Sequence, residues 1–380
     1  GGGLNLAQYK VYTDRNVALG DDSDSLILNL AGESLVGTGV VAISTYPGVG
    51  IGWDAGHVII TNVGMINVGG INASAASGSS WAGSAYPGSI IIGGPGNLAG
   101  SIRVGFLFAN PIWGSAGDGA PISVYGSGDV KIESVGGVAS NIDTTSISSD
   151  AGPVNIQHDG SFRVNNVDTF AEGGLTASGN GANITCNGDV QGNGASGYFQ
   201  AANLRSYYSR WSYGQETGDI LITGYTNVLI TGDILSYNNG PGGNCYGGEI
   251  VITNIAGNVT VQGIINADAY YGDTRDGKLE IRTKASSGGV ITLAMLDCLT
   301  VSNATLYADS GRSYITGSVL NFDTSNPSGQ WRLDAASGQR IFYEYVSGLT
   351  NNYLGGREYM LPSGGRLTPR RPGGTVMGAR

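Results

Sequence analysis

A pair of apolar residues separated by a single position recurs along the chain at a nearly constant interval. The first five pairs are 32 residues apart four times running, and the next four follow at intervals of 30, 36, 30 and 29. The pairs are Leu26/Leu28, Val58/Ile60, Ile90/Ile92, Ile122/Val124, Val154/Ile156, Ile184/Cys186, Ile220/Ile222, Ile250/Ile252 and Leu279/Ile281. Self-similarity at a fixed period of this length indicates a repeat architecture.

Each repeat carries further apolar positions. A second pair follows in several repeats, at Ile66/Val68, Val130/Ile132, Phe162/Val164, Val228/Ile230 and Val259/Val261. A third apolar residue follows at Ile71, Val135, Val167, Ile234 and Ile264. Alternation with period two is typical of short strands, and the Gly, Asn, Asp and Ser residues between them suit tight turns. A repeat is therefore expected to form two strands, a short third strand and a loop.

One such repeat cannot bury its apolar face alone, but stacked repeats bury a continuous interior. The sequence predicts an all-β fold, a parallel β-solenoid of nine to ten coils with a repeat of about 32 residues. The usual crossover preference makes it a right-handed β-helix. We expect the solenoid over 26–318, an N-terminal strand or capping segment over 1–25, and a C-terminal strand with an extended basic arm over 319–380.

Composition agrees with this class and excludes others. Glycine supplies 66 residues and charged residues only 13%, which argues against long helices. No apolar run reaches the roughly 18 residues of a membrane helix, so no membrane span is expected.

The chain has a net charge of −10, unevenly distributed. Residues 312–380 hold eight arginines and four acids, whereas the rest holds 11 basic and 25 acidic residues. Between Arg15 and Arg205 the only basic residues are Arg103, Lys131 and Arg163. An acidic body repels phosphate backbones, so we expect no nucleic acid partner.

The residue between the first apolar pair should point to solvent. Early in the chain it is Ile27, Ile59 and Ile91, and five of the nine such residues are apolar. A monomer seldom leaves an apolar stripe uncovered. Loops or the terminal arm, or another subunit, are expected to cover it.

A solenoid exposes unpaired strand edges at both ends, which favours edge-to-edge pairing. We expect head-to-tail stacking in which Arg366, Arg370 and Arg371 of the basic arm lie on Asp21, Asp22 and Asp24 of a neighbouring copy. A heterologous contact of this kind does not close and gives a filament. The alternative is an arm that folds back on its own rod or is disordered.

Residues that carry chemistry are few. His57 and His158 have no recognisable nucleophile motif, and the acids are scattered, with no stacked pair at one repeat position. Cys186, Cys245 and Cys298 lack metal-binding spacing. Cys186 falls at an apolar strand position and is expected to be a buried small hydrophobe, with a disulfide as the alternative. No catalytic residue, cofactor or metal ligand is predicted.

Aromatic residues and arginine cluster in 205–213. Tyr207, Tyr208, Trp211 and Tyr213 lie there, and such side chains suit stacking on sugar rings. A packed loop or a subunit contact is the competing interpretation.

Two segments, Gly128–Val135 and Gly257–Ala267, resemble coils of bacterial surface adhesins of the filamentous-haemagglutinin and autotransporter-passenger type. The resemblance is one of coil style over roughly residues 26–311. It implies a secreted, cell-surface, right-handed β-helix with structural or adhesive work. The opening Gly1-Gly2-Gly3, without a signal peptide, is consistent with a processed form.

The sequence therefore favours a non-enzymatic extracellular structural protein that assembles head-to-tail with copies of itself into a surface filament or sheath. The alternative is a carbohydrate-binding adhesin or a glycan-cleaving β-helix, with cell-surface or extracellular polysaccharide as its partner.

Overall fold

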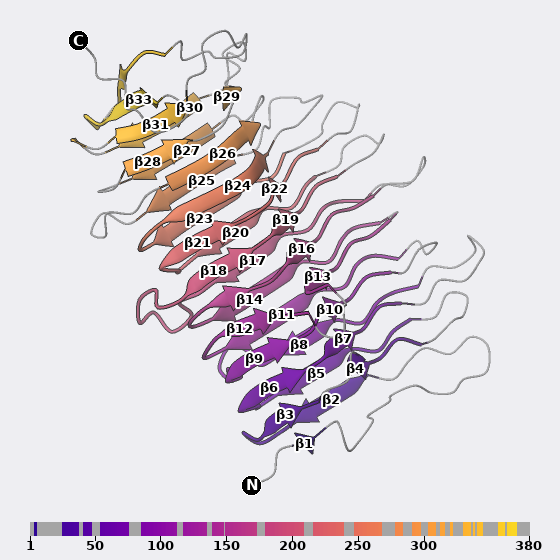
Figure 1. Cartoon of the computed structure of the whole chain (residues 1–380). Coiled ribbons are helices and arrows are strands. Elements are labelled where there is room, and N and C mark those ends of the chain that lie inside the picture. The colour runs from indigo at the N-terminus through magenta and orange to yellow at the C-terminus, as the bar shows by residue number, and fades with distance from the viewer. Residues whose placement is uncertain are drawn as a thin grey trace.

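The structure is a rod of stacked β-coils, with the two chain ends at opposite ends of the rod (Figure 1). This computed structural model describes residues 4–5, 25–37, 41–47, 54–75, 85–111, 117–134, 139–147, 149–172, 179–208, 216–238, 247–267, 278–283, 291–297, 303–308, 312–315, 320–321, 330–335, 337–338, 340–344, 356–361 and 363–370. Regular elements in these ranges are all strands. The all-β parallel solenoid predicted from the repeat is confirmed.

The first strand of each coil belongs to an eleven-stranded parallel sheet. Its strands, in spatial order, are β2 (Leu26–Asn29), β5 (Val58–Thr61), β8 (Ile90–Ile92), β11 (Ile122–Gly126), β14 (Val154–His158), β17 (Ile184–Asn187), β20 (Ile220–Thr223), β23 (Ile250–Ile255), β25 (Lys278–Thr283), β27 (Asn303–Ala308) and β30 (Gln330–Ala335). The predicted apolar pairs stack directly on one another, as in Leu26 on Val58 and Val58 on Ile90.

The second and third strands of the coils form the other sheet. The second strands are β3 (Ser34–Val36), β6 (Met65–Val68), β9 (Ser101–Val104), β12 (Val130–Ile132), β15 (Phe162–Arg163), β18 (Tyr198–Ala201), β21 (Asn227–Ile230), β24 (Val259–Asn266), β26 (Ile291–Asp297), β28 (Arg312–Ile315), β31 (Arg340–Glu344) and β33 (Arg366–Arg370). The third strands are β4 (Val41–Ser44), β7 (Gly70–Asn72), β10 (Leu107–Phe108), β13 (Asn141–Asp143), β16 (Asn166–Asp168), β19 (Asn203–Arg205), β22 (Ile234–Leu235) and β29 (Leu320–Asn321). The short β1 (Leu4–Asn5) pairs with β3, and β32 (Tyr359–Met360) pairs antiparallel with β33.

The number of coils differs from the nine to ten expected, because eleven strands stack in the first sheet. The six turns from Leu26 to Ile220 average about 32 residues, but the later steps fall to 30, 29, 25 and 27. The two further coils place Ala304 and Trp331 at the apolar position, where the repeat pattern is weak. The right-handed turn stays a prediction.

Two expected third-strand positions are displaced. In the fourth coil Ile142, and not Val135, stacks between Leu107 and Val167, and Val135 lies outside the described residues. In β24, Ile265 lies beside Ile234, one residue after the expected Ile264, in the same register that places Val259 beside Val228. An inserted segment causes the first error. The second arises ahead of β24, because Val259 follows Ile250 by one residue more than Val228 follows Ile220.

Polar residues at the corners bind the coils together. Ahead of the first strand, Oγ of Ser25 accepts the N–H of His57, and Nδ1 of His57 accepts the N–H of Ser89. Later coils repeat the pattern. The Asn183 side chain accepts the backbone N–H of Asp219, and the Asp219 side chain accepts the backbone N–H of Glu249. Each side chain thus satisfies a backbone donor of the next coil, which explains the Asn, Asp and Ser content of the turns.

The interior is a continuous apolar core. Strands of the first sheet alternate inward buried and outward partly exposed residues, and Val58, Ile60, Ile90 and Ile92 are fully buried. Each such side chain contributes roughly 1.5–3 kcal/mol relative to exposure. Cys186 belongs to this core and is a free thiol, which confirms the small-hydrophobe interpretation. Cys245 and Cys298 lie outside the described residues.

The outward apolar stripe exists as a stack of Ile27, Ile59 and Ile91 on adjacent strands. Ile27 is 67% exposed, whereas Ile59 and Ile91 are partly buried. What covers the stripe stays a prediction.

Part of the C-terminal segment continues the stack. β30 pairs with β27, β31 with β28, and β33 with β31. Arg366 and Arg370 therefore lie in a strand on the chain's own rod, and Arg366 pairs with Glu358. Arg371, Asp21, Asp22 and Asp24 lie outside the described residues, so their contact with a neighbouring copy stays a prediction.

Candidate functional site

Three basic side chains form a column on the outer face of the second sheet. Lys131 of β12 is in register with Arg103 of β9 on one side and with Arg163 of β15 on the other. Their strand neighbours Ile102, Val130 and Phe162 are buried, so strand alternation points the three cations outward. We call Arg103, Lys131 and Arg163 the cation column.

Two acids partly neutralise the column. Glu133 lies 2.8 Å from Nε of Arg103 and 4.0 Å from Nη1 of Arg163, and Asp129 lies 3.0 Å from Nζ of Lys131. Burial raises the pKa of Asp129, but hydrogen bonds from Ser161 and Lys131 outweigh it and lower that pKa overall. Three cations against two carboxylates leave an excess of about one positive charge in an otherwise acidic part of the chain.

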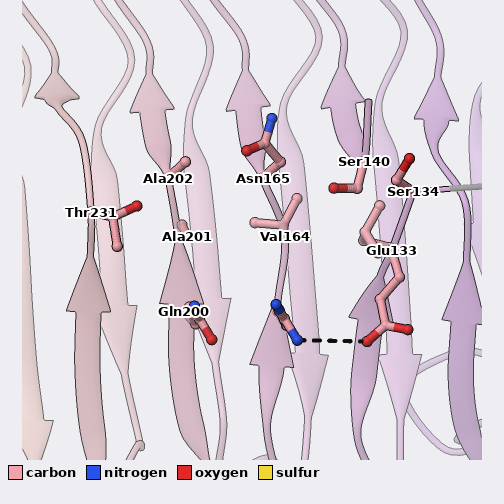
Figure 2. Close-up of a pocket in the computed structure, with 11 residues that line it drawn as sticks. Glu133, Ser134, Ser140, Val164, Asn165, Gln200, Ala201, Ala202 and Thr231 are labelled. Carbon is pink, nitrogen blue, oxygen red and sulfur yellow. Dashed lines mark ion pairs between the residues drawn. The ribbon is translucent and has the colours of Figure 1, made fainter. Parts of the chain in front are cut away.

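A groove runs beside the column where the second strands turn into the third. Its volume is about 440 Å³, and it crosses four coils (Figure 2). It is lined by Ile132, Glu133, Ser134, Ser140, Arg163, Val164, Asn165, Gln200, Ala201, Ala202 and Thr231. Four coils at the spacing of parallel strands extend over about 14 Å. The groove therefore runs along the rod, parallel to its axis.

Small side chains and backbone hydrogen bonds shape the groove. Val164 and Ala201 are buried and give it an apolar floor. The backbone N–H of Val164 donates to the carbonyl oxygen of Gln200 at 3.0 Å. The N–H of Ala202 donates to the carbonyl oxygen of Asn165 at 2.7 Å. The N–H of Thr231 donates to the carbonyl oxygen of Ala201 at 3.0 Å. Because each turn is bonded to an adjoining coil, the walls are held in place before any ligand arrives.

Beyond the groove, the third strands carry a second charged set. Asp143 and Asp168 are register partners, and Asp168 is in register with Arg205. The expectation that no acids stack at one repeat position is therefore wrong. Sequence spacing missed the pair because the fourth coil was aligned on Val135, whereas Ile142 occupies that position.

The acid pair is held tightly by its neighbours. Arg205 donates to both oxygens of Asp168 at 2.6 and 2.9 Å, and the Asp168 side chain is 8% exposed. Burial alone would lower the pKa of Arg205, but the hydrogen bond and charge of Asp168 raise it. Asp143 accepts from the Thr145 amide and hydroxyl at 2.9 and 2.8 Å, and burial raises its pKa to about 6. This arrangement suits an internal polar ladder better than attack on a substrate, because Asp168 is covered and doubly bonded.

An aromatic ladder follows on the same face. The rings of Phe170 and Tyr207 lie 4.7 Å apart at 6°, and those of Tyr207 and Tyr237 lie 5.0 Å apart at 5°. The Arg205 guanidinium lies 5.7 Å from the centre of the Phe170 ring. Both faces of Tyr207 are covered by its neighbours, so only the ring edge and hydroxyl are left for a ligand.

The predicted carbohydrate-contact residues separate in the structure. Tyr207 is partly buried in the ladder, and burial raises its pKa to about 12. Tyr208 is fully buried, because neighbouring strand positions face opposite sides, and it does not reach the surface where a sugar would bind. Trp211 and Tyr213 lie outside the described residues.

Within the described residues no three His, Cys, Asp or Glu side chains gather as metal ligands. Over the same ranges no helix is long and apolar enough to cross a membrane. Comparison with known proteins finds no matching family model, no similar curated protein and no similar solved structure.

Proposed function

We propose that the protein is a non-enzymatic rod of the cell surface that binds an extended polysaccharide along its groove. The observation that supports this proposal most is the direction of the groove, which crosses four adjoining coils on a backbone already fixed by hydrogen bonds. A polymer lying along the rod would contact every coil it crosses.

The lining suits a sugar chain. Gln200, Asn165 and Thr231 bring amide and hydroxyl groups to the walls, and Val164 and Ala201 give an apolar floor. Sugar hydroxyls both donate and accept hydrogen bonds, as these side chains do, while the C–H faces of the rings pack on small apolar residues. The surface location is proposed from the resemblance of the coils to secreted adhesins.

A blocking substitution tests the proposal. Ala202→Phe would fill the groove, and Ser123→Phe is a matched control on the outward face of β11. On a glycan array and in titration calorimetry, the wild type and Ser123→Phe should bind the same polysaccharide, and Ala202→Phe should lose at least tenfold in affinity. Equal binding by all three, or no glycan bound by the wild type, would reject the proposal.

Self-assembly head-to-tail is the second candidate, and the ends of the rod favour it. Within the part of the chain that the structure describes, the two most exposed large apolar side chains are Ile27 at 67%, in the first coil, and Met360 at 76%, near the last described strand. Among the described residues, β2 pairs with β5 alone. Negative-stain microscopy should then show fibres for the wild type and single rods for Ile27→Asp or Met360→Asp.

A further inference from the structure

We infer that the polysaccharide carries carboxylate groups, and that the cation column binds them. The inference rests on the proposed function, since the column gives chemical selectivity to the same groove. Arg163 joins the two features, because it belongs to the column and also lines the groove.

The stacking of the column is unfavourable for the fold itself. Like charges placed directly opposite on neighbouring strands destabilise a sheet, and Arg103, Lys131 and Arg163 occupy consecutive positions of one ladder. They are the only basic residues between Arg15 and Arg205, yet they meet at one place. A ligand with negative groups would relieve this repulsion.

The ion pairs that Glu133 forms with the cation column leave Arg103 and Arg163 able to bind such a ligand. Glu133 is shared between two arginines, and its distance to Arg163 is 4.0 Å. The Arg163 side chain is 51% exposed and that of Arg103 is 59% exposed. A guanidinium presents a planar pair of donors that fits a carboxylate in bidentate fashion, so both arginines can turn toward an incoming anion.

The next position of the same ladder, beyond Arg163, carries a neutral hydrogen-bond donor. Gln200 is the register partner of Arg163, and its side-chain amide makes no hydrogen bond to a described residue. A chain lying along the rod would therefore meet three cations and then an amide, at steps of about 4.8 Å. This order suits a polyuronate, in which charged groups and hydroxyls alternate along an extended backbone.

The test compares two polymers with the same backbone. Polygalacturonate carries the carboxylates, and its methyl ester lacks their charge. Calorimetry at low salt should show the wild type binding polygalacturonate about tenfold or more tightly than the ester, and added salt should reduce the difference. The triple variant Arg103→Gln/Lys131→Gln/Arg163→Gln should lose that preference and keep its affinity for the ester. Arg282→Gln, which removes an arginine paired with Glu280 in a later coil, is the matched control and should behave as wild type.

The outcomes separate the two proposals. Equal affinity for both polymers overturns the inference about charge and leaves the groove as a neutral glycan site. Binding of neither polymer, nor of any array glycan, overturns the proposed function as well. Tighter binding of polyglutamate than of polygalacturonate, lost in the triple variant, would assign the column to an acidic protein segment. Circular dichroism melting curves should show all variants folded, and the triple variant, which removes the repulsion within the cation column, should melt at or above the wild-type temperature.

Discussion

Nε2 of His158 and the hydroxyl oxygen of Tyr225 lie 2.9 Å apart inside the rod, two coils from one another. Nδ1 of the same ring lies 3.3 Å from the Gly128 carbonyl oxygen. A carbonyl can only accept, so Nδ1 carries the proton and Nε2 accepts from Tyr225. Burial lowers the pKa of His158 and so favours this neutral imidazole, which packs beside Phe162. Its charge state should therefore affect the stability of the rod.

Acidification is expected to destabilise the rod through His158. Burial lowers the pKa of His158 below its usual 6.5, against weaker opposite effects of Asp159 and Gly128. The unfolded chain then binds the proton more readily, so this stabilisation is complete above pH 6.5 and is lost as pH falls through the folded-state pKa. Urea unfolding between pH 7.5 and 5 should show this loss, and His158→Leu should remove that part of the slope.

The same pair allows a double-mutant test. His158→Leu alone leaves the buried Tyr225 hydroxyl without its partner, which costs about 1–3 kcal/mol. His158→Leu/Tyr225→Phe removes both polar groups, and we expect it to be more stable than the single His158→Leu variant. A double variant that is less stable by the sum of both single losses would contradict the hydrogen bond.

Asp143 should give a pH dependence of the opposite sign. Its pKa is raised from 3.8 to about 6, mainly by burial. The folded state therefore holds the proton more tightly, so the stabilisation is present below about pH 3.8 and is lost as pH rises through 6. Asp143→Asn should increase the free energy of unfolding at pH 7 by order of 1 kcal/mol and remove this part of the curve. A less stable variant at pH 7 would show that the ionised form is favoured.

The ion pair between Asp168 and Arg205 should matter more than the exposed pairs. Asp168→Asn leaves a partly buried guanidinium without its bidentate partner, and we expect a loss of about 1–3 kcal/mol in urea unfolding. Asp129→Asn is the control, because Asp129 pairs with Lys131 near solvent, and such pairs contribute about 0–1 kcal/mol. Equal losses in the two variants would count against a special role for the buried ladder.

Glycine at one corner is expected to be required by close packing of coils. A Cβ on Gly100 would overlap the Gly64 carbonyl oxygen of the preceding coil, whereas a Cβ on Gly96 would meet no atom within 4 Å. Gly100→Ala should lower the unfolding free energy by about 1–3 kcal/mol, and Gly96→Ala by no more than about 0.5 kcal/mol. Similar melting temperatures for the two variants would refute the overlap.

The thiol of Cys186 should be inert in the folded protein. The residue is fully buried, and burial raises its pKa, so little thiolate forms. Peptide mapping after iodoacetamide treatment should find Cys186 unmodified in the native state and modified in urea. Rapid native labelling would mean that the coils around β17 open easily.

The fold could be predicted well from the sequence because the same side chains recur at matching positions. Leu26, Val58 and Ile90 repeat both type and spacing, so their stacking follows from period alone. The last coils were missed because Ala304 and Trp331 break the aliphatic pattern. Spacing also fails wherever a corner gains residues, as happens ahead of Ile142.

The site was harder to predict, although part of it has a sequence signal. Lys131 and Arg163 stand inside the second pairs Val130/Ile132 and Phe162/Val164, and Arg103 stands between Ile102 and Val104 in the same way. An alignment of these three segments stacks the three cations. The groove has no such signal, since it depends on how far each corner bends and on the small volume of Ala201 and Ala202. The aromatic ladder of Phe170, Tyr207 and Tyr237 was hidden because their separations of 37 and 30 residues differ.

In the described part of the chain, the strands of both sheets other than β32 pair in parallel with their counterparts in adjoining coils, and this has a consequence for how such chains change. Deletion of one repeat removes one coil, and the two interfaces of that coil are replaced by one. Duplication of one repeat adds a coil, and the two interfaces become three similar ones. The length of the rod is then open to adjustment in steps of one coil without redesign of the interior, and under the proposed function the length of polysaccharide it binds would change with it.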